Sequence, residues 1–95
     1  IVHNLPAFFR APSPDPQAWV ATYEDLIVSG VANDHSKVVN YAAQPDAALA
    51  APDWEHFMPV IYALGAQRDG ETPRFFNRYH YPGISMTAFA YGLPQ

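Results

Sequence analysis

Two histidines stand in settings that could support metal or acid–base chemistry. His3 lies in the apolar opening segment IVHNL, residues 1–5, and His56 lies in EHFMP, residues 55–59. A neutral imidazole is a common ligand of divalent metals, and it titrates near neutral pH. Two such rings beside apolar residues therefore predict part of a metal site. The chain has no cysteine, so a metal would be held by His, Asp or Glu.

The element expected to position His56 is a helix that follows Asp53. Asp53 is a good N-cap residue, and His56 then falls in the first turn. The exposed N–H groups there disfavour imidazolium by a few tenths to about 1 kcal/mol, which favours the neutral ring that a metal requires. Apolar residues follow at helical spacing and the helix is expected to end at Gly65; they are Phe57, Val60, Ile61 and Leu64.

Pro59 interrupts this helical pattern. Inside an ordinary helix a proline removes one donor and clashes with the preceding turn, at a cost of about 3 kcal/mol. A proline at an unfavourable helix position so close to His56 indicates a functional site there.

The first third of the chain predicts a strand end, a loop and a helix. Residues 1–5 are expected to end a buried strand, and residues 6–14 are expected to form a loop that carries several prolines. Asp15 is then a candidate N-cap with Pro16 at the first helical position. Apolar residues at helical spacing continue from there, and Gly30 is a plausible stop.

The remaining segments predict one short helix and two strands. The short helix is expected to begin at Asp34, and an alanine-rich turn or helical stretch lies between Pro45 and Pro52. Residues 75–81 and 84–91 have the alternation of strands, joined through Pro82 and Gly83. The elements alternate within one domain, without internal repeats.

Composition limits the class of protein. With 95 residues and 49% hydrophobic content, the chain can bury a core. Five Lys+Arg against nine Asp+Glu give a net charge of −4, which predicts no binding to nucleic acid. No apolar run is long enough to span a bilayer, and the lack of cysteine fits a cytoplasmic protein. There is no starting methionine, so we expect the chain to begin inside a strand of something larger.

Other polar residues have simpler interpretations. His35 lies in a polar helix start and is expected to be solvated. His80 could face a pocket or extend an aromatic strand, and the second interpretation is favoured. Two further pairs are expected to serve structure rather than catalysis: Glu24 and Asp25, which are adjacent on a helix and diverge, and Ser85 and Thr87, which alternate on a strand face.

Several strings occur in an order and at intervals that match a known family. They are IVHNL at 1–5, VNY at 39–41, EHFMP at 55–59 with YALGA at 62–66, and GISM at 83–86 with a closing Gly92. Together they resemble the DOPA-type extradiol ring-cleavage dioxygenases, the class III group related to the catalytic subunit of protocatechuate 4,5-dioxygenase. The resemblance covers nearly the whole chain. The first and third strings are specific in combination, and any one string alone is weak.

The resemblance implies an α/β fold with a central sheet flanked by helices, of which residues 1–95 are the C-terminal portion. It implies a non-haem metal, iron(II) for catalysis with zinc(II) also possible, and a catechol-type substrate opened by O2. His56 matches a metal ligand. His3 matches either a ligand or a neighbouring acid–base group. The N-terminal portion of the same enzyme would supply further histidines, so this portion alone would be inactive.

Two alternatives to this function stay open. The chain could be a non-catalytic C-terminal subunit or remnant that binds a partner through an open strand edge. It could also belong to a metal-dependent enzyme of related fold that hydrolyses or isomerises, since fold alone does not fix the reaction. Departures from the family pattern at Pro6, Trp54 and residues 78–82 bear on the identity of the substrate more than on the metal.

Overall fold

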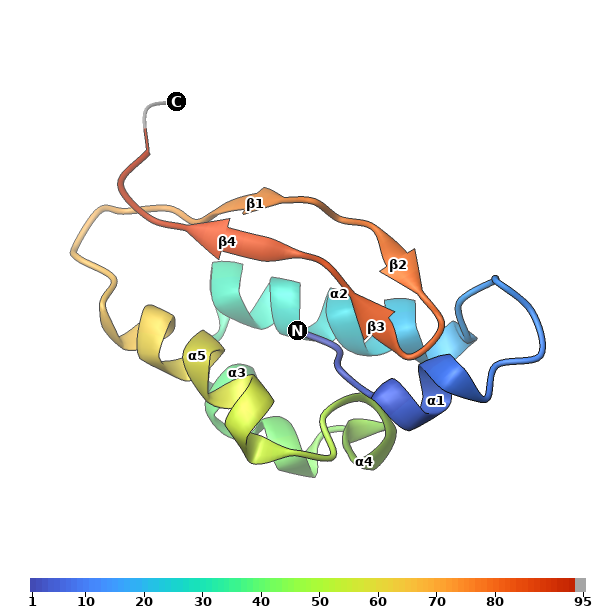
Figure 1. The fold of residues 1–95 in the computed structure, drawn as a ribbon. Helices are drawn as coiled ribbons and strands as arrows, with labels where there is room; N and C mark the ends of the chain where they lie inside the picture. The colour runs from blue at the N-terminus through green and yellow to red at the C-terminus, as the bar shows by residue number, and fades with distance from the viewer. Residues whose placement is uncertain (94–95) are drawn as a thin grey trace.

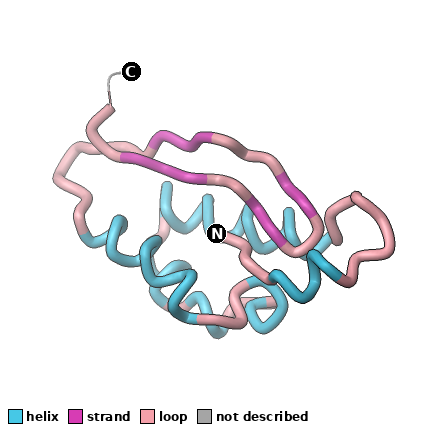
Figure 2. The backbone as a smooth tube through the Cα atoms, in the orientation of Figure 1, coloured by secondary structure: helices cyan, strands magenta, loops and turns pink. Residues whose placement is uncertain are grey.

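The computed structural model describes residues 1–93, which combine helices and short antiparallel strands (Figures 1 and 2). Six helical segments come first and four strands follow. Their bounds are α1 Leu5–Phe9, α2 Ala18–Asn33, α3 His35–Val39, the 3₁₀ turn η1 Tyr41–Ala43, α4 Ala47–Ala50, α5 Trp54–Gly65, β1 Arg74–Phe76, β2 His80–Tyr81, β3 Ile84–Ser85 and β4 Ala88–Ala90.

Aspartate caps begin two of the helices where the sequence predicts them. The Asp34 carboxylate accepts a hydrogen bond from Ser36 N at the start of α3, and the Asp53 carboxylate accepts one from Glu55 N at the start of α5. Each bond satisfies one of the donors that a helix start leaves without a partner in the helix. Helix α5 continues through Pro59 to Gly65, so its predicted extent is confirmed.

Helix α2 differs from its prediction at both ends. It begins at Ala18 with Gln17 as the N-cap, not at Pro16 after Asp15, and it runs through Gly30 to Asn33. Gly30 is buried, and a Cβ on it would lie only 2.9 Å from Val38 Cγ2. This glycine therefore permits close packing between α2 and α3 and does not end the helix.

The predicted loop over residues 6–14 is wrong in its first part, because α1 covers Leu5–Phe9. Asn4 Oδ1 accepts a hydrogen bond from Ala7 N, 3.0 Å away, which caps this helix, and Pro6 occupies its first turn, where a proline costs no hydrogen bond. The strand expected over residues 1–5 is not formed, because α1 begins at Leu5 and the preceding residues make only an isolated bridge at His3.

The four strands form one irregular hairpin. β1 pairs with β4, with Phe75 opposite Phe89, and β2 pairs with β3, with His80 opposite Ser85. Pro82 and Gly83 make the turn between β2 and β3, so the predicted connection is confirmed, but each of the two predicted strands, 75–81 and 84–91, is interrupted and forms two short strands. Ser85 is buried at the inner face of this hairpin, as is Thr87.

The predicted central sheet flanked by helices is not seen in residues 1–93. The sheets there are two-stranded and antiparallel, and the opening residues add an isolated bridge between His3 and Ile84. Val2 O accepts a hydrogen bond from Ser85 N at 3.0 Å, so the opening segment runs beside β3. What the structure supports is mixed helix and strand content.

The core lies where α2 meets its neighbours. In Figure 1 the hairpin lies along one side of α2, while α3, α4 and α5 lie on the other side, with the opening residues between them. The buried apolar side chains come from every part of the chain and include Val2, Val20, Tyr23, Ile27, Val31, Val38, Phe57 and Leu64. None of the helices in residues 1–93 has the length and apolar character needed to cross a membrane.

Candidate functional site

The structure places the two sequence-predicted histidines side by side. The imidazole rings of His3 and His56 are stacked, with centroids 4.0 Å apart and an angle of 26° between their planes. The two residues are 53 positions apart in the sequence (56 − 3), so tertiary structure brings them together. No other pair of histidines is in ring contact within the described part of the chain.

Backbone contacts from two directions hold His3. Its N–H donates to Ala50 O at 2.9 Å, which ties it to the end of α4. It also bridges Ile84 of β3. His56 is held differently, by its place in the first turn of α5 after the Asp53 cap. One histidine is thus fixed by a strand contact and the other by a helix start.

A shallow pocket of about 190 Å³ surrounds the histidine pair. Asp53 shares it, with its Oδ2 atom 3.7 Å from His56 Nε2. The side chains of His56 and Asp53 are each about half exposed, at 53% and 50%, so a ligand could reach them from solvent. The remaining walls are formed by Asn4, Leu5, Pro6 and Pro52.

The electrostatic surroundings favour the neutral form of His3. Burial lowers the pKa of His3 below its ordinary value of 6.5, and the neighbouring His56 lowers it further, while Asp53 opposes the shift. At neutral pH the ring therefore keeps a free nitrogen lone pair. Such a lone pair can accept a proton or coordinate a metal.

The donor set at this pocket suits a divalent metal in its chemistry. Imidazole nitrogen and carboxylate oxygen both bind iron(II) and zinc(II). Within residues 1–93, however, no group of three or more His, Cys, Asp or Glu side chains is arranged to hold a metal ion. His3 and His56 could therefore supply part of a coordination sphere.

Asn4 is a site residue that the sequence prediction missed. Its side-chain amide donates to Leu49 O at 2.7 Å, and its backbone N–H donates to Gly83 O at 2.7 Å. Its Oδ1 atom caps α1 at the same time. One residue thus connects α1, α4 and the turn of the hairpin beside His3. An asparagine followed by Leu-Pro is a local capping signal that could have identified it.

The other polar residues also have defined places. His35 is exposed, as expected. Ser85 Oγ accepts a hydrogen bond from Val2 N at 3.1 Å, which confirms a backbone-binding role. His80 lies in β2, as the favoured interpretation held, but its ring also binds the carboxylate of Glu24, which the sequence did not predict. Glu24 is fully buried whereas its neighbour Asp25 is exposed, and Arg78 lies within 4 Å of both carboxylates.

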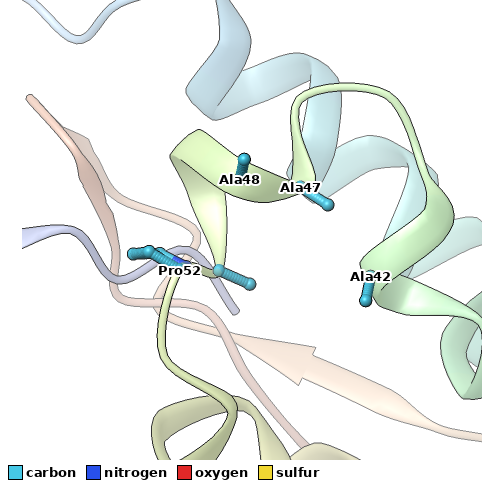
Figure 3. Close-up of a pocket in the computed structure, with 5 residues that line it drawn as sticks. Ala42, Ala47, Ala48 and Pro52 are labelled. Carbon is cyan, nitrogen blue, oxygen red and sulfur yellow. The ribbon is translucent and has the colours of Figure 1, made fainter.

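Another hollow on the surface lacks chemistry-bearing side chains. Figure 3 shows it between η1 and the end of α4, and its lining consists of Ala42, Ala47, Ala48, Ala51 and Pro52. Methyl groups offer neither a proton nor a metal ligand. The pocket at the histidine pair is therefore the stronger candidate for a functional site.

Comparison with known proteins agrees with the resemblance seen in the sequence motifs. No family model matches the chain, and no solved structure matches it. Over 78 residues the chain is 30% identical to a 4,5-DOPA dioxygenase extradiol from Escherichia coli (strain K12). The match takes in 77% of this chain but 28% of that protein, so the chain spans less than a third of its relative. The chain is therefore a distant relative of a DOPA-type extradiol dioxygenase over part of that enzyme's length.

Proposed function

We propose that this chain supplies part of the metal site of a non-haem extradiol dioxygenase, which opens the ring of a catechol-type substrate with O2. The observation that carries the proposal is the stacked pair of His3 and His56 in an open pocket. The partial relationship to a 4,5-DOPA dioxygenase supports the reaction class.

We assign a separate task to each histidine. His56, half exposed at the start of α5, would be a metal ligand. His3, whose lowered pKa keeps its ring neutral, would be either a second ligand or the base that takes a proton from a catechol hydroxyl. Iron(II), when bound, supplies open coordination positions for the catechol oxygens and dioxygen, and zinc(II) suits the same donors. Further ligands would come from the N-terminal portion of the same enzyme.

Metal titration followed by NMR tests the assignment residue by residue. On addition of zinc(II) to the purified protein, we expect the ring signals of His3 and His56 to move together while those of exposed His35 stay in place. His56→Ala should abolish the movement of the His3 signals, because a single imidazole is a weak site. His35→Ala is the matched control and should bind as the unmodified protein does.

Three results would count against this assignment. Movement of the His35 signals with those of His3 and His56 would indicate nonspecific binding. Metal uptake that survives His56→Ala without loss would place the metal elsewhere. A folded protein that takes up no metal would favour the alternative of a non-catalytic binding module.

A second experiment tests the reaction class. The chain, combined with the N-terminal portion of the same enzyme, is loaded anaerobically with iron(II) and mixed with a catechol, and air is then admitted. We expect a visible absorption band from a ring-opened product that depends on both oxygen and His56. Turnover of the catechol without oxygen consumption would instead support a hydrolase or isomerase of related fold.

A further inference from the structure

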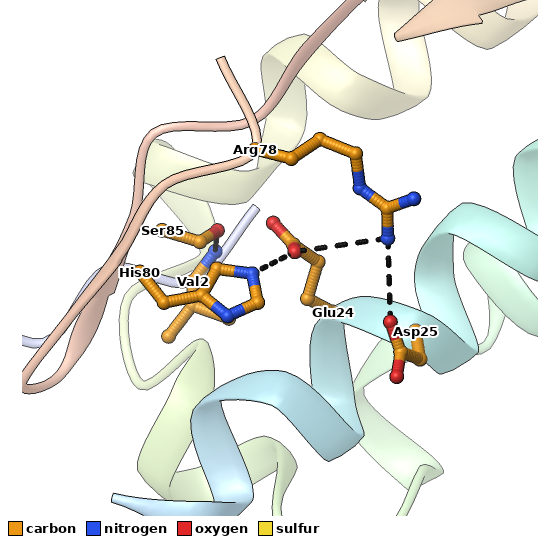
Figure 4. Close-up of polar contacts among 6 residues, drawn as sticks. All are labelled: Val2, Glu24, Asp25, Arg78, His80 and Ser85. Carbon is orange, nitrogen blue, oxygen red and sulfur yellow. Dashed lines mark hydrogen bonds and ion pairs between the residues drawn. The ribbon is translucent and has the colours of Figure 1, made fainter. Parts of the chain in front are cut away.

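A buried carboxylate lies between α2 and the β2–β3 hairpin. Glu24 of α2 has no exposed surface, and its Oε2 atom binds His80 Nε2 of β2 (Figure 4). Arg78 lies 3.9 Å from the same oxygen and 3.3 Å from Asp25 Oδ1. A buried carboxylate is costly unless it is paired and hydrogen-bonded, so these partners of Oε2 offset part of that cost, while Oε1 is buried without a hydrogen-bond partner among the described residues.

The surroundings keep Glu24 ionised. Burial raises the pKa of its carboxyl group, but polar contacts with Thr87, His80 and Ser85 outweigh burial and lower the pKa below its ordinary value of 4.5. Thr87 and Ser85 lie on the inner face of the hairpin, and His80 lies on the strand opposite Ser85. The charge therefore attracts one face of the hairpin to α2.

The same hairpin holds the opening segment that carries His3. Ser85 N donates to Val2 O at 3.0 Å. Ser85 Oγ accepts from Val2 N at 3.1 Å (Figure 4), so the backbone N–H and C=O of Val2 both bind Ser85. The next residue, His3, bridges Ile84. Contacts thus run without interruption from Glu24 through His80 and Ser85 to His3.

The turn at Pro82 and Gly83 and the β1–β4 pairing both constrain the register of this hairpin, and the buried pair adds a further constraint at its short end. β2 and β3 are two residues long each, so their ladder alone fixes the pairing weakly. A slip of one residue would turn Ser85 from the inner face to solvent and release Val2. If Ser85 instead kept its place, the same slip would turn His80 away from Glu24 and leave a buried charge without its partner, because residues opposite each other in an antiparallel pair lie on the same face. A buried ionic pair is best attested in this kind of role, in which it specifies register.

We propose that Glu24 and His80 form a positioning pair, which fixes the register of the β2–β3 hairpin and thereby holds His3 against His56. Neither residue is placed in contact with substrate or metal. The inference rests on the proposed function only for the importance given to His3. The geometric relation between the pair and the stacked rings can be tested without metal or substrate.

The test compares two substitutions that each remove one negative charge from adjacent positions of α2. Glu24→Gln removes the buried charge, and Asp25→Asn removes the exposed one. We expect the NMR cross-peaks between the rings of His3 and His56 to be lost in Glu24→Gln and retained in Asp25→Asn, with both variants still unfolding cooperatively. The zinc(II) affinity of Glu24→Gln should fall by about tenfold, as is typical when groups that orient a ligand are changed.

The outcomes separate this inference from the proposed function. Cross-peaks that persist in a folded Glu24→Gln protein overturn the inference, whatever the metal data show. Loss of the cross-peaks in a protein that binds no zinc(II) even when unmodified sustains the inference and rejects the proposed function. If Glu24→Gln fails to fold, His80→Gln provides the same test from the partly exposed side of the pair, and persistence of the cross-peaks there overturns the inference.

Discussion

At the scale of single residues, Asn4 links more of the site than either histidine. Its side chain caps α1 and binds Leu49 O, and its backbone binds Gly83 O. His3 is the preceding residue, so displacement of Asn4 moves the ring that stacks on His56. Short-range capping and long-range positioning are thus combined in one amide side chain.

Substitution of Asn4 by alanine tests this role. Asn4→Ala removes the cap of α1 and the bond to Leu49 O, and we expect the free energy of unfolding to fall by about 1 to 2 kcal/mol. The cross-peaks between the rings of His3 and His56 should weaken as well. Asn40→Ala is the control, because the Asn40 side chain makes no capping bond, and its effect should stay within about 0.5 kcal/mol. Urea unfolding measures both; equal effects would contradict the assignment.

At the scale of elements, the turn of the hairpin is pressed against the opening segment. Gly83 has φ of 66°, and its N–H donates to Gln17 Oε1 at 2.8 Å. A Cβ at this position would lie 2.5 Å from Asn4 O, which is backbone and cannot easily move. The approach of the hairpin to the histidine pocket therefore depends on the absence of a side chain.

Two glycine substitutions separate the cost of a side chain at positive φ from the cost of a steric clash with neighbouring atoms. Gly83→Ala and Gly70→Ala both place a Cβ at positive φ, which costs roughly 1 to 2 kcal/mol, but a Cβ at Gly70 would meet nothing within 4 Å. We expect Gly83→Ala to be the more destabilising by about 1 to 3 kcal/mol, because it also forces the turn away from Asn4. Comparison of the two unfolding free energies checks this; equal losses would mean that the turn can shift at no cost.

At the scale of the whole molecule, the buried carboxylate links stability to pH. The pKa of Glu24 is lower in the folded protein than its ordinary value of 4.5, so the folded state favours the charged form. The corresponding stabilisation is fully present above pH 4.5 and is lost as the pH falls through the folded-state pKa.

Unfolding in urea at a series of pH values tests this linkage. We expect the protein to lose stability as the pH falls below about 4.5, and the difference between it and Glu24→Gln to shrink over the same interval. Asp25→Asn should parallel the unmodified protein, because its exposed pair with Arg78 contributes little to stability. A constant difference between the protein and Glu24→Gln across the series would contradict the prediction.

The features that the sequence predicted correctly depend on neighbouring residues. The Asp53 cap and the apolar spacing of α5 both act within one or two turns, so the helix start and the place of His56 in its first turn follow from local chemistry. The same holds for the α3 cap at Asp34 and for the turn at Pro82 and Gly83. The motifs around His3 and His56 also sufficed to indicate the relationship to an extradiol dioxygenase.

The features that the sequence alone could not determine depend on residues far apart in the chain. Glycine commonly ends a helix, but α2 continues beyond Gly30 to Asn33, and Gly30 packs against Val38. His80 and Glu24 are 56 positions apart, and nothing local to either residue identifies its partner. The stacking of His3 on His56 likewise depends on the packing of α4, the hairpin and α5 against one another. Only tertiary structure decides such contacts, because capping and periodicity act over a few residues whereas burial and charge pairing depend on the whole packed core.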